Sequence, residues 1–293
     1  MTEKLPTYGG QAVIEGVMMR GAQSVAIAMR APDNQIVVHT EALSGIYKSK
    51  ITKIPFLRGL VMLWDALGLG MRALTISANT QSGEDEKLEG PALYLTLGLS
   101  LAIGIGLFFV APAGIGQLAE HYLQINAWWS NLIEGLVRLA ILVAYIWLIA
   151  FMPDVRRVFS YHGAEHKTIN AFEADVELTP ENVSKFSVEH PRCGTAFLLT
   201  LVLLSILVFS LLGPMPTVWR LLSRIIFLPL LAGVAYEYIR WTANHLDSSF
   251  VRWMIKPNLA LQHLTTREPN LEMLEVSIAA FNAMRAQEKQ ITL

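Results

Sequence analysis

Four long apolar runs dominate the chain after residue 90, at residues 91–115, 131–152, 195–212 and 218–238. Runs of about 20 apolar residues are typical of transmembrane helices. The last two are separated only by Gly-Pro-Met-Pro at residues 213–216, which is too short and stiff for anything but a tight turn. The pattern therefore predicts an α-helical integral membrane protein with about four transmembrane helices in two hairpins.

A different pattern precedes the membrane segments. Apolar and polar residues alternate in residues 24–30 and 35–40, which flank Ala-Pro-Asp-Asn at 31–34, and residues 12–19 add a third candidate strand. Alternation with a period of two around a turn is typical of a β-hairpin. Residues 270–287 instead repeat apolar residues at helical spacing. We expect a small α+β part containing an antiparallel sheet, on which this amphipathic helix docks.

Residues 55–79 are predicted to form an apolar helix with a narrow polar line. Its polar residues recur every seven positions, at Arg58, Asp65, Arg72 and Asn79, so they share one side of a helix. We interpret this segment as an amphipathic helix in the membrane interface. Two alternatives stay open: the polar line faces a functional site, or the helix is re-entrant or membrane-spanning. An acidic, solvated linker follows at residues 82–90.

The basic residues indicate how the chain is oriented. Of the 23 Lys and Arg, nine lie in residues 1–90, five in residues 153–193 and six from residue 239 onward, whereas residues 116–130 contain none. Because cytoplasmic segments carry an excess of Lys and Arg, we expect both termini in the cytoplasm. The predicted segments are 1–54 (cytoplasmic, β-rich), 55–90 (interfacial helix and acidic linker), 91–152 (first transmembrane hairpin), 153–193 (cytoplasmic loop), 194–238 (second transmembrane hairpin) and 239–293 (cytoplasmic C-terminal segment with the amphipathic helix).

The composition agrees with a membrane protein and narrows the classes of function. Hydrophobic residues make up 53% of the chain and charged residues 16%, whereas soluble domains carry about 25% charged residues. The net charge is −1, so we expect no nucleic acid as a partner. A single cysteine excludes an internal disulfide.

The sequence H-x-x-E-H at residues 162–166 is the strongest candidate for chemistry. If this segment is helical, His162 and His166 are one turn apart on the same face, and both imidazoles can bind one metal ion. Glu165, beside them, is the candidate general base. The same order of residues occurs in inverzincin peptidases. We therefore expect a divalent metal, with zinc favoured.

Two histidines do not complete a metal site, because zinc takes three or four ligands. The same loop ends with His190 and Cys193, and Glu173 and Glu237 are further candidate ligands near the same membrane boundary. The alternative is that these polar residues only bind helix ends or lipid headgroups. For Cys193 alone, a small buried apolar residue is the alternative.

Charged residues also occur inside the predicted spans. Glu134 and Arg138 are spaced i, i+4, and Arg220 and Arg224 enter the fourth span at the same level. Charges within a span suggest function by default. Because these four lie near the outer edge of the membrane, we expect a structural ion pair between the two hairpins instead.

Five stretches together resemble one protein family. They are residues 9–21 (GGQAVIEGVMMRG), 55–59 (PFLRG), 161–167 (YHGAEHK), 190–195 (HPRCGT) and 264–269 (LTTREP). The chain resembles the bacterial YqhQ family, domain of unknown function 1385, whose members are described as predicted metal-dependent membrane enzymes. The resemblance implies the following site residues: Glu15, Arg20, Arg58, His162, Glu165, His166, His190, Arg192, Cys193, Arg267 and Glu268.

Three functions follow from these expectations. The first is a metal-dependent, hydrolase-like enzyme of the bacterial inner membrane with its site at the cytoplasmic interface. There, Glu15, Arg20, Arg58, Arg192, Arg267 and Glu268 would bind an amphipathic or anionic substrate, and membrane lipid surrounds the protein. The second is a non-catalytic scaffold or regulator that binds a cytoplasmic partner. The third, a small transporter or channel that could form as a homo-oligomer, is disfavoured because the spans carry almost no charge at mid-depth.

Overall fold

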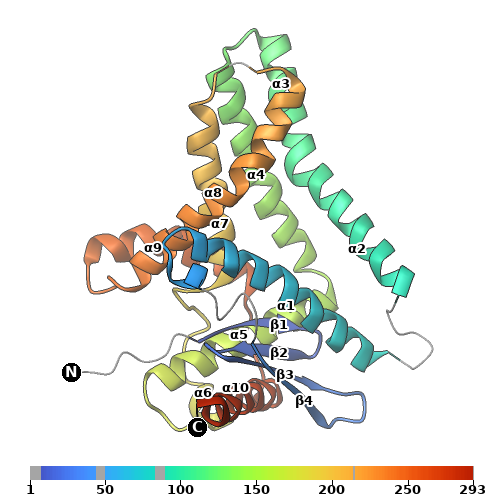
Figure 1. Cartoon of the computed structure of the whole chain (residues 1–293), viewed down its shortest axis with the longest axis vertical. Helices are drawn as coiled ribbons and strands as arrows, with labels where there is room; N and C mark the ends of the chain where they lie inside the picture. The colour runs from blue at the N-terminus through green and yellow to red at the C-terminus, as the bar shows by residue number, and fades with distance from the viewer. Residues whose placement is uncertain (1–7, 44–49, 83–89, 214, 293) are drawn as a thin grey trace.

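The computed structural model describes residues 8–43, 50–82, 90–213 and 215–292. The molecule has two parts (Figure 1). Long apolar helices form a bundle at one end, and a β-sheet covered by helices forms the other, so the expected mixture of a helical bundle and a small α+β part is confirmed.

The sheet is a four-stranded antiparallel meander. Strands β1 (Gly9–Val13), β2 (Gly16–Arg20), β3 (Ser24–Arg30) and β4 (Ile36–Ala42) pair in sequence order. The single strand expected at residues 12–19 is wrong, because the chain reverses at Ile14 and Glu15, where Glu15 has a φ of 51°. The two turn residues, Ile14 and Glu15, are not the Asn-Gly or Asp-Gly pair typical of such turns, so the reversal had no clear signal.

Two helices from distant parts of the chain cover the sheet. Helix α5 (Pro153–Glu173) packs on β1 and β2, and helix α10 (Leu271–Thr292) packs on β2, β3 and β4 as well as on α5. The shared core contains Tyr161 and Ile169 of α5 and, from α10, Leu274, Ile278, Phe281 and Met284. The expected apolar face of the last helix is therefore buried, except for Leu271, which is exposed. The short helix α6 (Pro180–Val183) closes this core.

Three helical segments are long and apolar enough to cross a membrane: Gly90–Leu123, Ala127–Ile149 and Val218–Ala243. The first comprises α2 (Gly90–Ile105), a π-helical turn η4 (Gly106–Val110) and α3 (Ala111–Leu123); the others correspond to α4 (Ala127–Ile149) and α8 (Thr217–Ala243). The fourth apolar run forms α7 (Gly194–Ser210), which is shorter. Helices α4 and α7 pack against each other, as do α7 and α8.

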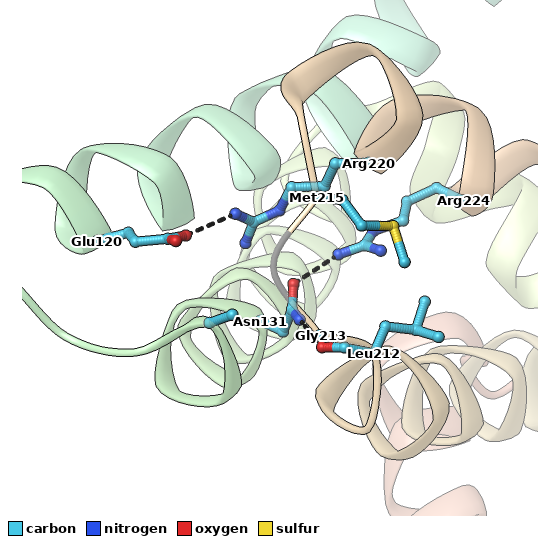
Figure 2. A pocket seen from close by; sticks show the side chains of 8 residues that line it. Glu120, Asn131, Leu212, Gly213, Met215, Arg220 and Arg224 are labelled. Carbon is cyan, nitrogen blue, oxygen red and sulfur yellow. Dashed lines mark hydrogen bonds and ion pairs between the residues drawn. The ribbon is translucent and has the colours of Figure 1, made fainter.

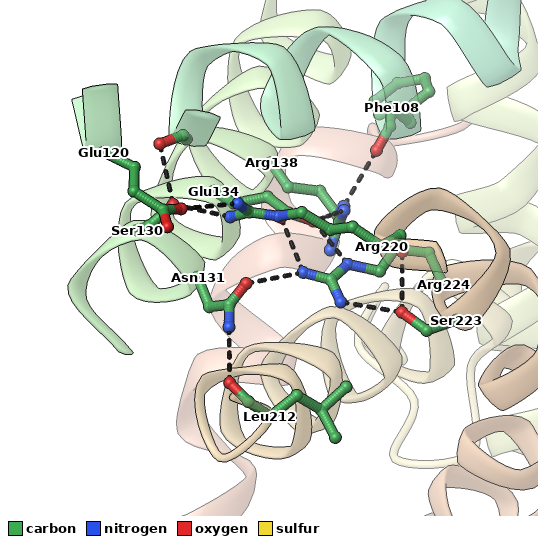
Figure 3. A network of polar contacts seen from close by, with 11 residues as sticks. Phe108, Glu120, Ser130, Asn131, Glu134, Arg138, Leu212, Arg220, Ser223 and Arg224 are labelled. Atoms are coloured by element: carbon green, nitrogen blue, oxygen red, sulfur yellow. Dashed lines mark hydrogen bonds and ion pairs between the residues drawn. The ribbon is translucent and has the colours of Figure 1, made fainter. Parts of the chain in front are cut away.

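An ion-pair network ties the bundle together at the end away from the sheet (Figure 3). Glu134 accepts hydrogen bonds from Arg138, Arg220 and Arg224, at 2.7–3.0 Å. Arg138 also donates to the carbonyl of Phe108 at 2.9 Å. That carbonyl lies four residues before Pro112, which has no N–H to offer. The expected structural pairing between the two halves of the bundle is confirmed.

Two further helices lie between the bundle and the sheet. Helix α1 (Leu57–Gln81) follows a short 3-10 turn η2 (Lys50–Lys53) and packs on α8 and β1, and α9 (Ser249–Thr265) packs on α4 and α7. Within the polar line of α1, Arg58 binds Glu237 and Arg72 binds Glu41. The side chain of Asp65 and most of the acidic linker, residues 83–89, lie outside the described residues.

Candidate metal centre

The H-x-x-E-H sequence lies on α5, where this helix meets the start of α7 and the end of α9. His162 and His166 are one turn apart, and their ring centroids are separated by 4.4 Å. The position between them, Gly163, requires glycine, because a Cβ there would be 2.2 Å from the carbonyl oxygen of Arg267. The absence of a side chain at this position lets the segment after α9 run close along α5.

Backbone carbonyls fix the orientation of both imidazole rings. His162 Nδ1 is 2.9 Å from the carbonyl oxygen of Thr265, and His166 Nδ1 is 2.5 Å from that of Val188. A carbonyl only accepts hydrogen bonds, so each ring donates from Nδ1, and the neutral ring keeps a lone pair on Nε2. Histidines that bind metals are held in this way. His166 Nε2 is buried and has no hydrogen-bond partner among the described residues.

Cys193 supplies a third donor atom. Its Sγ is 3.2 Å from His162 Nε2, and one donor atom each from Cys193, His162 and His166 lie within 4.8 Å of one another. Cys193 is buried and forms the N-cap of α7, where its sulfur accepts a hydrogen bond from the backbone N–H of Thr195. The N-terminus of a helix favours negative charge, which suits a sulfur that binds a cation.

Glu165 is buried between α5 and β1. Its Oε2 is 4.0 Å from His162 Nε2, and it accepts a hydrogen bond from the backbone of Gly10. A Cβ on Gly10 would lie 3.0 Å from Glu165 Cγ and 2.5 Å from the Met18 carbonyl oxygen, so glycine allows the close approach of β1. Burial raises the pKa of Glu165 to about 7, although His162 and the Gly10 N–H act in the opposite direction.

His190 lies beside the three-residue cluster. Its ring centroid is 5.7 Å from that of His166, and its Nε2 is 3.8 Å from Glu173 Oε2, beyond hydrogen-bond distance. Burial lowers the pKa of His190. Burial acts to raise the pKa of Glu173, but His190 and Arg192 outweigh it and hold that pKa below its usual value. The side chain of Gln262 in α9 binds the backbone of His190 twice. Its oxygen accepts from the His190 N–H at 3.0 Å, and its nitrogen donates to the His190 carbonyl at 2.8 Å.

Glu237 was expected as a further metal ligand, but the structure does not bring it into the cluster. Its carboxylate accepts hydrogen bonds from Arg58 and from the backbone N–H of Phe56. This pairing joins the start of α1 to α8. Arg58, expected to bind substrate, is thus occupied by the same contact.

The other residues expected to bind substrate are held by separate partners. Glu15 accepts two hydrogen bonds from Arg157, at 2.5 and 2.6 Å, which lower its pKa. Glu268 pairs with Lys167, and Arg192 pairs with Glu173. Arg20 donates to the carbonyl of Gly21, and Arg267 donates to those of His263 and Thr266. These contacts do not gather the basic side chains around one point.

The groups that orient the cluster were not predicted. Val188 and Thr265 act through backbone carbonyls, which leave no pattern in a sequence. Lys167 and Asn170 hold the loop that presents Val188, by donating to the carbonyls of Ser184, Phe186, Ser187 and Glu189. A signal existed for Gly10, Lys167 and Thr265, which lie in three of the stretches that carry the family resemblance.

Comparison with known proteins places the chain in a family. The family described as "Protein of unknown function (DUF1385)" matches residues 54–287. The chain belongs to this family. The "Uncharacterized protein YqhQ" of Bacillus subtilis (strain 168) is 34% identical over 294 residues, which are 95% of this chain and 92% of the relative. No solved structure matches the chain. Neither description states a function.

Proposed function

We propose that this protein is a metal-dependent hydrolase of the bacterial cytoplasmic membrane, with a divalent cation, zinc in the first place, held by His162, His166 and Cys193. One observation supports this most strongly: both rings donate from Nδ1 to backbone carbonyls and leave Nε2 beside a thiol. The orphaned Nε2 of His166 fits a metal, because buried polar atoms without partners are rare in proteins. Two imidazoles and one thiolate are a ligand set that zinc accepts.

The chemistry follows from three ligands and one adjacent carboxylate. Catalytic zinc sites use three protein ligands and leave one position open, and a cation there supplies a Lewis acid and an activated water. Glu165 lies 4.0 Å from a ligand nitrogen and is oriented by the Gly10 N–H. It is the residue we assign to hold and transfer a proton. His190 lies next to His166, and Glu173 lies next to His190, on the same side of the proposed site.

We further propose four spans with both termini in the cytoplasm. The three membrane-length helices and the shorter α7 supply them; α7 is about 26 Å long at 1.5 Å per residue, close to the thickness of the hydrocarbon core. The excess of Lys and Arg outside the bundle supports this orientation. The cluster then lies at the inner face of the membrane, next to the first residue of α7.

This depth favours an amphipathic substrate that reaches the site from the membrane. Cys193 caps a span, whereas Glu165 faces a strand of the α+β part. Such a position suits a substrate whose apolar tail stays in the membrane while its hydrolysable polar head reaches the cluster.

Metal content of the purified protein tests this function. The wild-type protein, purified without chelator in detergent and loaded with zinc, is expected to retain about one zinc per chain after desalting, measured by plasma mass spectrometry. Variants H162A, H166A and C193S should each lose it. The matched control is H263A, because His263 is an exposed histidine whose partner, Glu189, lies outside the three-residue cluster.

Two outcomes would count against the proposal. The first is a wild-type protein that retains no zinc and no other divalent metal. The second is metal retained equally by H166A and the wild type. Either would leave the alternative, a non-catalytic membrane scaffold that binds a cytoplasmic partner, as the better account.

A further inference from the structure

Helix α9 has one buried face, which packs on the apolar bundle. Leu261 lies in a cluster with Leu142 and Ile146 of α4, and Asn258 donates to the Thr200 hydroxyl of α7 at 3.3 Å. Leu142 and Ile146 belong to the membrane-length segment Ala127–Ile149. The middle of α9 therefore packs against a helix that is long and apolar enough to cross a membrane.

The outward side of α9 is divided into two stripes. Phe250 and Trp253 are 63% and 65% exposed, and their rings stack with centroids 6.2 Å apart. At three- and four-residue steps they continue into exposed Pro257 and Ala260, which complete one apolar stripe along the helix. The neighbouring stripe carries exposed Arg252 and Lys256, and the helix contains no Asp or Glu.

The chain holds the start of α9 close to the membrane boundary. Helix α8 ends at Ala243 and α9 begins at Ser249, so the five residues between them can reach at most about 18 Å. Figure 1 shows α9 running across the base of the bundle, beside the sheet-bearing part. An aromatic stripe next to a basic stripe, on a helix in this position, is typical of helices that lie in the membrane interface.

We propose that α9 binds the surface of an anionic phospholipid monolayer. The stripe of Phe250, Trp253, Pro257 and Ala260 lies among the upper acyl chains, and Arg252 and Lys256 lie at the headgroup phosphates. Continuity with the membrane-length helices and the wholly basic charge of α9 select this occupant over a second protein. The inference concerns a surface that the metal site does not use.

Lipid binding at α9 also supports the metal cluster, a consequence that rests on the proposed function. The C-terminal end of α9 supplies the Thr265 carbonyl that orients His162, and the Gln262 side chain that holds the His190 backbone. A monolayer that fixes α9 therefore also fixes the carbonyl on one metal ligand. This arrangement sets the cluster at headgroup level.

Depth measurements with spin labels test the surface. The full chain with C193S, which removes the single native cysteine, is labelled at one position at a time: W253C, K256C, L99C in α2 and D175C, an exposed residue after α5. In nanodiscs of phosphatidylcholine and phosphatidylglycerol, accessibility to oxygen and to a water-soluble nickel chelate is compared. We expect the oxygen-to-chelate ratio at residue 253 to approach that at residue 99, and that at residue 256 to lie between those at residues 253 and 175.

The outcomes separate the possible occupants. A ratio at residue 253 equal to that at residue 175 would overturn the proposal, and so would low accessibility to both reagents, which indicates a protein partner. R252E with K256E should raise chelate access at residue 253 in anionic nanodiscs, with residue 99 unchanged as the folding control. An unchanged ratio in that double variant would overturn the anionic part. Because C193S already lacks one proposed ligand, the result is independent of whether the cluster binds metal.

Discussion

The molecule contains two buried polar clusters, and they differ in how completely their atoms are bonded. In the bundle network, both oxygens of Glu134 accept hydrogen bonds from arginines, and those arginines also bind Ser130, Asn131, Ser223 and the Phe108 carbonyl. In the cluster of His162, His166 and Cys193, by contrast, the Nε2 atom of His166 is buried without a hydrogen-bond partner among the described residues, as is that of His190 beside it.

This difference separates a structural role from a binding role. A buried polar atom without a partner is costly, so proteins rarely leave one unless another group binds it. The network is explained by the helices that it joins. A small cavity lies beside it, lined by Glu120, Asn131, Arg220 and Arg224 among others (Figure 2), but the polar groups facing it already bind one another. The cluster instead leaves His166 Nε2 without a partner among the described residues, and this is the atom that the proposed metal would bind.

Removing the centre of the network should have the largest effect. E134Q leaves Arg138, Arg220 and Arg224 buried with a neutral amide in place of their shared anion, and breaking a buried pair of this kind costs about 3–5 kcal/mol. We expect a large fall in the unfolding temperature in detergent, measured by intrinsic fluorescence. The control is E120Q, since Glu120 is partly exposed and pairs with one arginine of the network, Arg220. Equal unfolding temperatures for E134Q and E120Q would contradict the structural role.

Zinc should stabilise the wild-type protein through the incomplete cluster. A ligand that binds only the folded state adds about 2.7 kcal/mol at a concentration 100 times its dissociation constant. We therefore expect zinc to raise the unfolding temperature of the wild type and of H263A. H166A, measured in the same titration, should show no rise. E134Q supplies the cross-check: it starts from a lower unfolding temperature but should still respond to zinc, because the two clusters lie at opposite ends of the bundle.

The sequence predicted those features that depend on neighbours along the chain. Apolar runs marked the bundle, and the spacing of His162 and His166 placed both rings on one helical face. The third donor could not be selected, because Cys193, His190, Glu173 and Glu237 were all plausible by residue type. The choice depends on where the chain places Cys193, the N-cap of α7, relative to His162, and on Arg58 binding Glu237.

The turn at Glu15 shows the same limit within the sheet. Apolar residues predict the strands, but the place where they reverse lacks the Asn-Gly or Asp-Gly pair that marks most two-residue hairpin turns. Here β1 ends at Val13 and β2 begins at Gly16. The reversal determines that Gly10 faces Glu165, so a missed turn also hides a contact in the site.

Gly10 of β1 tests whether close packing of this strand constrains Glu165 beside the cluster. G10A introduces a Cβ 2.5 Å from the Met18 carbonyl and 3.0 Å from Glu165 Cγ, and overpacking typically costs about 1–3 kcal/mol. We expect a lower unfolding temperature and a smaller shift with zinc. G98A is the matched control, because a Cβ at that helical glycine meets nothing within 4 Å. A G10A protein with the stability and zinc response of wild type would show that β1 does not constrain Glu165.

The smallest effect is expected where an ion pair is fully bonded but exposed. Glu15 and Arg157 form two short hydrogen bonds, yet the Arg157 side chain is 53% exposed, and pairs in contact with water contribute less than about 1 kcal/mol. The hydrogen bonds from Arg157 lower the pKa of Glu15. The contribution is therefore present above the ordinary carboxyl pKa of about 4.3 and is lost as the pH falls through the lower value in the folded protein. E15Q should unfold slightly more easily than the wild type near neutral pH, with the difference disappearing in acid. A difference as large as that for E134Q would mean that completeness of bonding, rather than burial, determines what an ion pair contributes in this protein.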